Sequence, residues 1–176
     1  MHCRVLTKLK KRRCPITIQR ELDFVLGDSY VQSRRNLYRI VFLLAGAYNI
    51  CWGLHAAWDP QWSFRFGGMP ELNHPQIYAC LGMVIGLYGV LYLEIARAPE
   101  KGFILGAVGM FGKVAGPIGM VALVANGEWP ARMLVTSIPN DFIWWIPFGM
   151  YLYDAWPSFW RDFQLWPAAP DEPKPT

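Results

Sequence analysis

The stretch that decides the fold is GFILGAVGMFGKVAGPIGMVALVA, residues Gly102 to Ala125. An α-helix rises ~1.5 Å per residue, and about 20 apolar residues cross the hydrocarbon core of a bilayer. The segment is long enough to cross, yet Lys113 lies near its middle. A cation at that depth costs at least ~2.5–3.5 kcal/mol on insertion scales, so it indicates a functional site. The stretch predicts a membrane helix with a buried polar residue.

Three further apolar stretches accompany this one. The predicted spans are residues 38–58, 75–96, 102–125 and 132–154, all helices because a lone strand cannot satisfy its backbone in lipid. Only 17% of the residues are charged, against ~25% in soluble domains. We therefore expect an all-α, four-helix transmembrane bundle over residues 37–157. Residues 1–36 form a basic cytoplasmic or interfacial tail in this interpretation, and residues 158–176 a Pro-rich disordered tail.

The distribution of charge predicts the orientation. Nine of the seventeen Lys and Arg residues precede residue 36, and the positive-inside rule then places both termini in the cytoplasm. A basic tail beside a span fits contact with anionic lipid headgroups. No stacking motif or recognition helix accompanies it, so no nucleic-acid partner is predicted. The first 30 residues lack the apolar region of a cleavable signal peptide, and an organellar transit peptide is an open alternative.

Two segments outside the spans have their own expected roles. The connection DPQWSFRFGGMPELNH, residues 59–74, is too polar and too broken by Pro and Gly to cross a membrane. We expect it to lie on the bundle as an extracytoplasmic cap. Residues 21–30 could form a short amphipathic piece at the membrane surface.

Small residues recur at steps of three and four along three of the spans. Such stripes let membrane helices approach closely, because water drives no association there, and helix packing is their simplest role. The stripes are Gly102, Gly106, Gly109 and Gly116; Ala79, Gly82, Gly86 and Gly89; and Ala45 or Gly46, Asn49, Gly53 and Ala56.

Lys113 belongs to the first stripe and should face the bundle interior. Pro117 has no N–H, so it frees the carbonyl of Lys113 and should kink the helix, with unpaired backbone oxygen beside the ammonium group. Asp141 in the last span is the favoured counter-ion. Side chains lean toward the N-terminus of their own helix, so these two lean apart in antiparallel helices. Asn140, Asn49 or a water molecule could bridge them.

The buried polar site has three competing interpretations. It could bind a lipid, a quinone or another small hydrophobic ligand. It could instead be a charge pair that fixes helix register, or part of a proton or ion path. In the ligand interpretation, a polar floor is lined by aromatic walls. The floor comprises Lys113, Asp141, Asn140 and Asn49, and the walls comprise Trp144, Trp145 and Trp52. The charge state of Lys113 stays open, because burial and a carboxylate act on it in opposite directions.

A metal site is not predicted, although three residues near one end of the bundle are candidate ligands. His55 and Asp59 are spaced i and i+4, and His74 begins the second span. Two histidines and a carboxylate could hold zinc or iron. No family spacing supports this, and hydrogen bonding or helix capping at the interface fits them better.

The cysteines do not suggest redox chemistry. Cys51 and Cys80 fall at similar depth in adjacent spans, and the chain has no CxxC motif. Their helical phase lies off the small stripes, which argues against a redox pair and leaves small apolar packing as their expected role. The chain also has no nucleophile, metalloprotease or phosphate-binding motif.

Certain strings carry a resemblance. They are AYNICWGLHAAWDP at 47–60, GKVAGPIGMVALV at 112–124 and NDFIWWIPF at 140–148. Residues 37–157 resemble an uncharacterised family of small bacterial four-helix membrane proteins, whose members are often labelled alkyl hydroperoxide reductase. The resemblance implies the fold and location in a bacterial inner (plasma) membrane, with a looser, fold-level analogy to DoxX-like proteins. Peroxide reduction needs an accessible, low-pKa thiolate, which thiols at lipid depth do not supply, so that activity is not carried over.

The favoured function is therefore a non-enzymatic membrane protein that binds a hydrophobic ligand or serves a partner complex. A membrane oxidoreductase linked to quinone or peroxide is the alternative, and quinone is then the cofactor. A proton-coupled transporter that uses Lys113 and Asp141 is a third hypothesis, and it would call for a homodimer.

Overall fold

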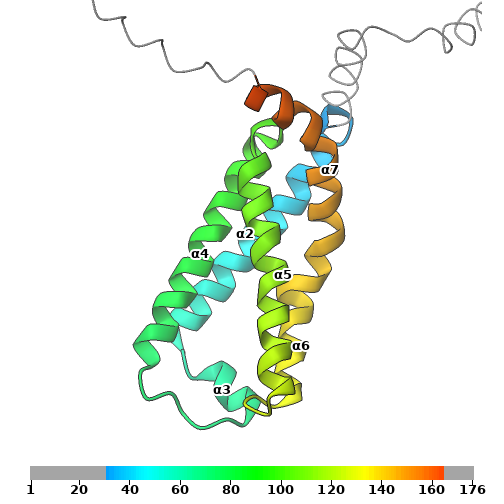
Figure 1. Cartoon of the computed structure of the whole chain (residues 1–176). Helices are drawn as coiled ribbons and strands as arrows, with labels where there is room; N and C mark the ends of the chain where they lie inside the picture. The colour runs from blue at the N-terminus through cyan, green and yellow to red at the C-terminus, as the bar shows by residue number, and fades with distance from the viewer. Residues whose placement is uncertain (1–30, 165–176) are drawn as a thin grey trace, which may run out of the picture.

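The computed structural model describes residues 31–164, and this part of the chain is helical without any strand. Figure 1 shows long, roughly parallel rods with a short helix, α3, near one end. The result confirms the predicted all-α class. In chain order, the α-helices are α2 Arg35–Trp58, α3 Trp62–Gly67, α4 Pro75–Arg97, α5 Phe103–Ala125, α6 Leu134–Ser137 and α7 Ile143–Gln164. The 3₁₀ turns η2 Pro99–Lys101 and η3 Ala131–Met133 and the π-helical turn η4 Ile138–Phe142 join them.

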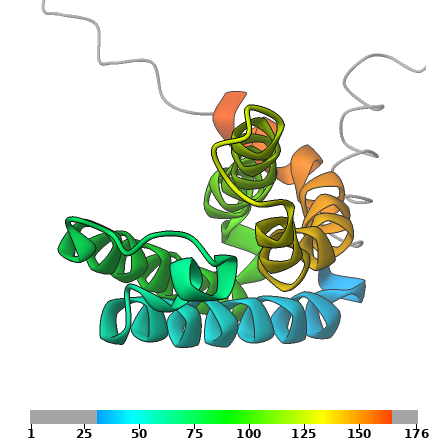
Figure 2. The same cartoon turned by 90° about the horizontal axis from the view of Figure 1, so that it is seen from below.

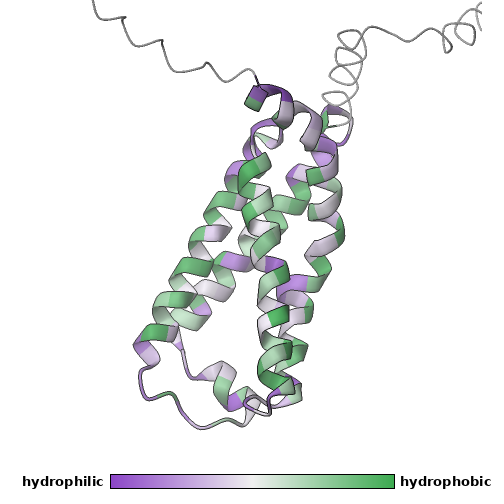
Figure 3. Cartoon of the chain, viewed as in Figure 1, coloured by the Kyte–Doolittle hydropathy of each residue, from purple (hydrophilic) through white to green (hydrophobic). Residues whose placement is uncertain are grey.

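Helices α2, α4 and α5 are each long and apolar enough to cross a membrane. Many of their apolar side chains point outward, with Ile77 and Phe111 71% and 74% exposed. Figure 3 shows apolar colour along the long helices and polar colour mainly at the two ends and in a band halfway along. Soluble proteins rarely expose so continuous an apolar surface. These helices indicate an integral membrane protein in contact with lipid.

The fourth apolar stretch differs from the single helix expected over residues 132–154. It consists of η3, α6, η4 and α7 in succession. Pro139 lies in η4 and has no N–H to donate, and the N–H of Ile143 reaches back five residues to the carbonyl of Ile138. Helix α7 also continues to Gln164, past residue 158, where the disordered tail was expected to begin.

The helices pack as two pairs, α2 along α4 and α5 along α7. The two pairs can be followed from below in Figure 2. Between α2 and α4 the backbones touch. A Cβ on Gly53 would lie 2.5 Å from the Gly82 carbonyl oxygen, and one on Gly89 would lie 2.7 Å from the Gly46 carbonyl oxygen. The small stripes predicted on these two helices are confirmed as a packing surface.

The glycines of α5 accommodate tyrosine rings from neighbouring helices. A Cβ on Gly106 would lie 2.8 Å from the Tyr151 ring, and one on Gly109 would lie 2.6 Å from the Tyr92 ring. Gly112, by contrast, has nothing within 4 Å of such a Cβ. The buried face of α5 runs through Gly106, Gly109, Lys113 and Pro117, and Gly112 lies on an open face beside it.

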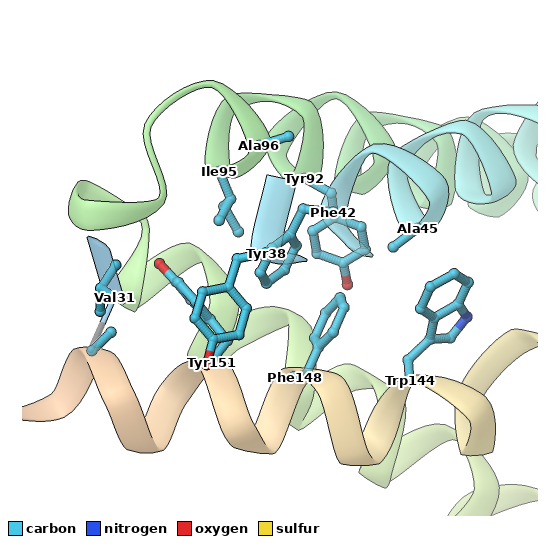
Figure 4. Close-up of a cluster of buried hydrophobic side chains, with 11 residues drawn as sticks. Val31, Tyr38, Phe42, Ala45, Tyr92, Ile95, Ala96, Trp144, Phe148 and Tyr151 are labelled. Atoms are coloured by element: carbon cyan, nitrogen blue, oxygen red, sulfur yellow. The ribbon is translucent and has the colours of Figure 1, made fainter. Parts of the chain in front are cut away.

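Aromatic rings join the two helix pairs. Figure 4 shows rings from α2, α4 and α7 turned toward one another in a buried cluster. The Phe42 ring centroid lies 4.6 Å from that of Phe148 and 4.8 Å from that of Tyr151. The Tyr151 hydroxyl donates a hydrogen bond of 2.7 Å to the Pro99 carbonyl and so ties α7 to the turn between α4 and α5.

The connection 59–74 lies on the bundle, as expected, through α3. Ser63 and Phe64 are buried, and the Tyr78 hydroxyl donates to Ser63 Oγ at 3.0 Å. Arg132 donates from Nε to the carbonyl of Gly67, which fixes α3 to the start of the last apolar stretch. Gly68 ends α3 in the left-handed conformation, with φ of 60°, which explains a glycine there.

Three expectations concern residues outside the described part of the chain. They are the basic tail up to residue 30, the amphipathic piece at 21–30 and the part of the Pro-rich tail from residue 165 onward.

Candidate functional site

Lys113 lies in the interior of the bundle, midway along α5, and is only 5% exposed. Its Nζ donates to Asn49 Oδ1 on α2 at 3.3 Å and to the backbone carbonyl of Asn140 in η4. Asp141 Oδ1 lies 3.9 Å from the same nitrogen, and Asp141 is also 5% exposed. The structure therefore brings together the four residues proposed as a polar floor.

The ion pair between Lys113 and Asp141 is not a direct hydrogen bond, because 3.9 Å exceeds hydrogen-bond range. Asn140 lies between the two charges. Its carbonyl accepts from the ammonium group, and its side-chain Nδ2 donates to Asp141 Oδ1 at 2.9 Å. This bridged arrangement agrees with two side chains that lean apart in antiparallel helices.

Tryptophan side chains hydrogen-bond to the backbone where the helices are interrupted by proline. The Trp145 indole Nε1 donates to the Lys113 carbonyl at 3.0 Å, the oxygen that Pro117 frees by lacking an N–H. The Trp144 indole Nε1 donates to the Pro139 carbonyl, also at 3.0 Å. The expected unpaired oxygen beside the ammonium group is therefore paired, and two of the three predicted wall residues are hydrogen-bond donors to the backbone. The third, Trp52, packs against His55 and Trp62.

One acceptor within the site has no partner. Asn140 Oδ1 is buried and makes no hydrogen bond with the described residues. An ammonium group has three donors, and only two acceptors lie within hydrogen-bond range of Lys113 Nζ in the described part of the chain. The cluster thus keeps one unfilled acceptor and one unfilled donor, in a protein where buried polar groups are nearly always paired.

Gly116 gives the site an open side. The residue is exposed on α5, and a Cβ there would lie 3.8 Å from one Asp141 carboxylate oxygen and 3.9 Å from the other. Gly112 and Gly119, one turn to either side, would meet nothing within 4 Å. The outer face of α5 beside Asp141 is therefore bare of side chains.

The three candidate metal ligands have separate surroundings. The His55 ring packs edge-on against Trp62, with 5.1 Å between centroids, and Asp59 forms an ion pair with Arg65. The Arg65 hydrogen bond lowers the pKa of Asp59. His74 is exposed at the N-cap position of α4. No three metal-ligating side chains come together within residues 31–164.

The cysteines depart from expectation. Cys51 and Cys80 are both free thiols, and both are exposed on the surface of the bundle. The expected role of both residues, small apolar packing, is therefore wrong. Each lies on the side of its helix that is turned away from the partner helix, where lipid would contact the thiol.

A second buried carboxylate was missed from the sequence. Asp154 on α7 is 6% exposed and accepts hydrogen bonds from the Tyr38 hydroxyl and, at 3.1 Å, from Arg34. Helical spacing could have found it, because Asp154 follows Trp144, Phe148 and Tyr151 on the buried face of α7.

No family model, curated protein or solved structure matches this chain. What the Lys113 site can do is therefore argued from its own geometry.

Proposed function

We propose that this protein spans the membrane four times and binds a small hydrophobic ligand with a polar head at the Lys113–Asp141 site. In this proposal α6, η4 and α7 make the fourth crossing, with α7 alongside α5. Both ends of the described chain lie at the same end of the bundle (Figure 1). That end also carries Arg35, Arg97 and Lys101, so the positive-inside rule favours a cytoplasmic position for both termini.

The observation that carries the proposal is the unpaired Asn140 Oδ1 next to an incompletely paired Lys113 ammonium group. An unsatisfied buried acceptor costs ~1–3 kcal/mol, and no water is available in a bilayer core to offset this. A ligand head with one donor and one acceptor would fill both vacancies. A hydroxyl group has this pair of functions, as in a quinol or a hydroxylated lipid.

The bare face of α5 supports entry of such a ligand from the bilayer. A head group that passes Gly116 reaches the Asp141 carboxylate first, and Asn140 lies directly beside it. The apolar tail of the ligand would remain in the lipid beside this bare face of α5. Gaining access to the buried Asn140 oxygen requires a local shift of η4, and a π-helical turn is a common place for such adjustment.

A membrane oxidoreductase linked to quinone is the second candidate, because a quinol, the reduced form of a quinone, would be a ligand of this kind. The positions of the thiols do not support thiol redox chemistry, since Cys51 and Cys80 face outward from the bundle. Redox chemistry would have to reside in the bound quinol, whose hydroxyl could accept from Lys113 Nζ and donate to Asn140 Oδ1.

Native mass spectrometry of protein released from gently purified membranes tests the proposal. Wild type and an Arg97→Leu control, which removes an exposed cation outside the site, should carry the same bound mass. Lys113→Leu and Asn140→Leu should lose it. If Lys113→Leu yields too little folded protein, Lys113→Leu with Asp141→Leu replaces it. A wild type without ligand, or equal bound mass in all variants, would overturn the proposal and leave a structural charge pair.

A further inference from the structure

A cavity of about 760 Å³ opens at the end of the bundle opposite α3, and the Lys113 site contributes nothing to it. Its lining comes from the residues just before α2, from η2 and from the end of α7. Most of these side chains can form hydrogen bonds or carry charge. The polar ones include Gln32, Ser33, Glu100, Lys101, Ser158 and Arg161.

The position of the cavity corresponds to the edge of the membrane. Ser33 precedes the start of α2 at Arg35, and Lys101 lies between the end of α4 at Arg97 and the start of α5. The cavity therefore lies at the same end of all three helices that are long and apolar enough to cross. Trp156 and Trp160 are half exposed nearby on α7, and tryptophan is enriched at the level of lipid headgroups.

The end of α7 is folded over this part of the bundle. Figures 1 and 2 both show the last turns of α7 directed away from the axis of the helix and toward α5. Pro157 lies inside α7, near its end, and removes a backbone hydrogen bond, which favours a bend in that part of the helix. The Phe159 ring stacks on Phe103 at the start of α5, with 4.3 Å between centroids. This contact holds Ser158 and Arg161 at the wall of the cavity.

The lining itself carries two cations, Lys101 and Arg161, and two carboxylates, Glu100 and Asp162; counted with Arg35 beside the cavity, the cations exceed the carboxylates by one. Glu100 lies 3.6 Å from Arg35, and Asp162 lies 3.0 Å from Arg161, so each carboxylate has an arginine partner. No carboxylate in the described part of the chain forms an ion pair with Lys101. Its ammonium group is a point charge well suited to phosphate oxygen. Val31 and Ala155, both buried, add an apolar floor.

From these observations we infer a second binding site, for the headgroup of an anionic phospholipid. The phosphodiester accepts hydrogen bonds from Lys101 and Arg161, and headgroup hydroxyls bond to Ser33, Gln32 or Ser158. Free phosphate shares the same anionic chemistry. The lipid is favoured because the cavity borders the spans and has an apolar floor, and basic pockets at this level of a membrane protein recognise anionic headgroups. The inference is independent of the function proposed for Lys113.

The test compares lipids and variants in the full-length protein. Thermal stability in detergent is titrated with phosphatidylglycerol, with phosphatidylcholine and with inorganic phosphate. Wild type should be stabilised selectively by phosphatidylglycerol. Lys101→Gln should lower the apparent affinity for phosphatidylglycerol about tenfold, because one charge-assisted hydrogen bond is lost. Ser33→Phe, which keeps the charges and narrows the cavity, should weaken the stabilisation by phosphatidylglycerol as well.

Arg97→Gln is the matched control, because Arg97 lies at the same end, is exposed and pairs with Glu94. It should respond to phosphatidylglycerol as wild type does. An equal loss in Arg97→Gln and Lys101→Gln would show general attraction between charges and overturn the site. Stabilisation by inorganic phosphate equal to that by phosphatidylglycerol would overturn the lipid as its ligand, and no selectivity among the three additives would overturn the inference altogether.

Discussion

Trp145 and Lys113 are joined by a hydrogen bond of 3.0 Å from the indole Nε1 to the backbone carbonyl. The carbonyl is free because Pro117, four residues later, has no N–H. In water the solvent would satisfy such an oxygen, but a bilayer core offers no solvent donor. The indole therefore compensates a break in one helix with a side chain from another. The same contact fixes α7 against α5 at the depth of the buried site.

Trp145→Phe is expected to destabilise the protein by ~1–2 kcal/mol, because the Lys113 carbonyl loses its donor while most of the ring packing remains. Pro117→Ala restores an N–H at position 117 and lets that carbonyl pair within its own helix. The cost of Trp145→Phe should then shrink in the Pro117→Ala background. Chemical unfolding in detergent micelles of the four members of this double-mutant cycle measures the coupling. Equal cost in both backgrounds would show that the indole acts by packing alone.

Lys113→Leu is expected to cost ~3–5 kcal/mol, because it leaves Asp141 buried without a compensating charge. The double variant Lys113→Leu with Asp141→Leu removes both charges and should be much closer to wild type in stability. The same unfolding assay in detergent compares them. A double variant as unstable as the single one would show that Asn49 and Asn140, rather than the charge pair, dominate the stability of the cluster.

Gly53→Ala and Gly112→Ala separate a packed glycine from an open one. A Cβ on Gly53 would lie 2.5 Å from a backbone oxygen of α4, so α2 and α4 must move apart. We expect a loss of ~1–3 kcal/mol, as for other overpacked interiors. Gly112→Ala meets nothing within 4 Å and should be neutral or stabilising by up to ~1 kcal/mol, because alanine favours the helix. Thermal unfolding in detergent measures both.

A destabilised Gly112→Ala would contradict this expectation and point to a second copy of the chain packed on that face. Measuring the molecular mass of both variants in detergent would then show whether the substitution separates a homodimer.

Lys113 and Asp141 could be found from the sequence because the cost of a charge in a membrane rises steeply with depth, and depth follows from position in an apolar run. The small stripes were equally accessible, since close approach of helices demands them at a helical period. The π-helical turn η4 could not be predicted from the sequence, because Pro139 indicates only that the helix is disturbed there. Which carbonyl then meets Lys113 depends on how η4 packs against α5.

The cysteines show where the reasoning from helical phase stopped short. Cys51 and Cys80 lie off the small stripes, as the phase predicted. In a soluble protein, positions off the packing face meet water, so a small apolar side chain such as cysteine is expected to be packed away from it. In a membrane they meet lipid, which solvates an exposed thiol at little cost. Phase thus located both residues correctly but did not distinguish packing from exposure.

The ion pair between Arg65 and Asp59 predicts a response to pH at the α3 end. The Arg65 hydrogen bond lowers the pKa of Asp59 below its ordinary value of 3.8. A carboxyl group whose pKa is lower in the folded state stabilises that state above its unfolded pKa, and this contribution is lost as pH falls through the folded pKa. The NMR signal of the Arg65 Nε–H should therefore shift with a midpoint below 3.8. The pair is exposed, so salt should move the midpoint back toward 3.8. Asp59→Asn should abolish the shift, whereas a midpoint at or above 3.8 would mean that the pair does not form in solution.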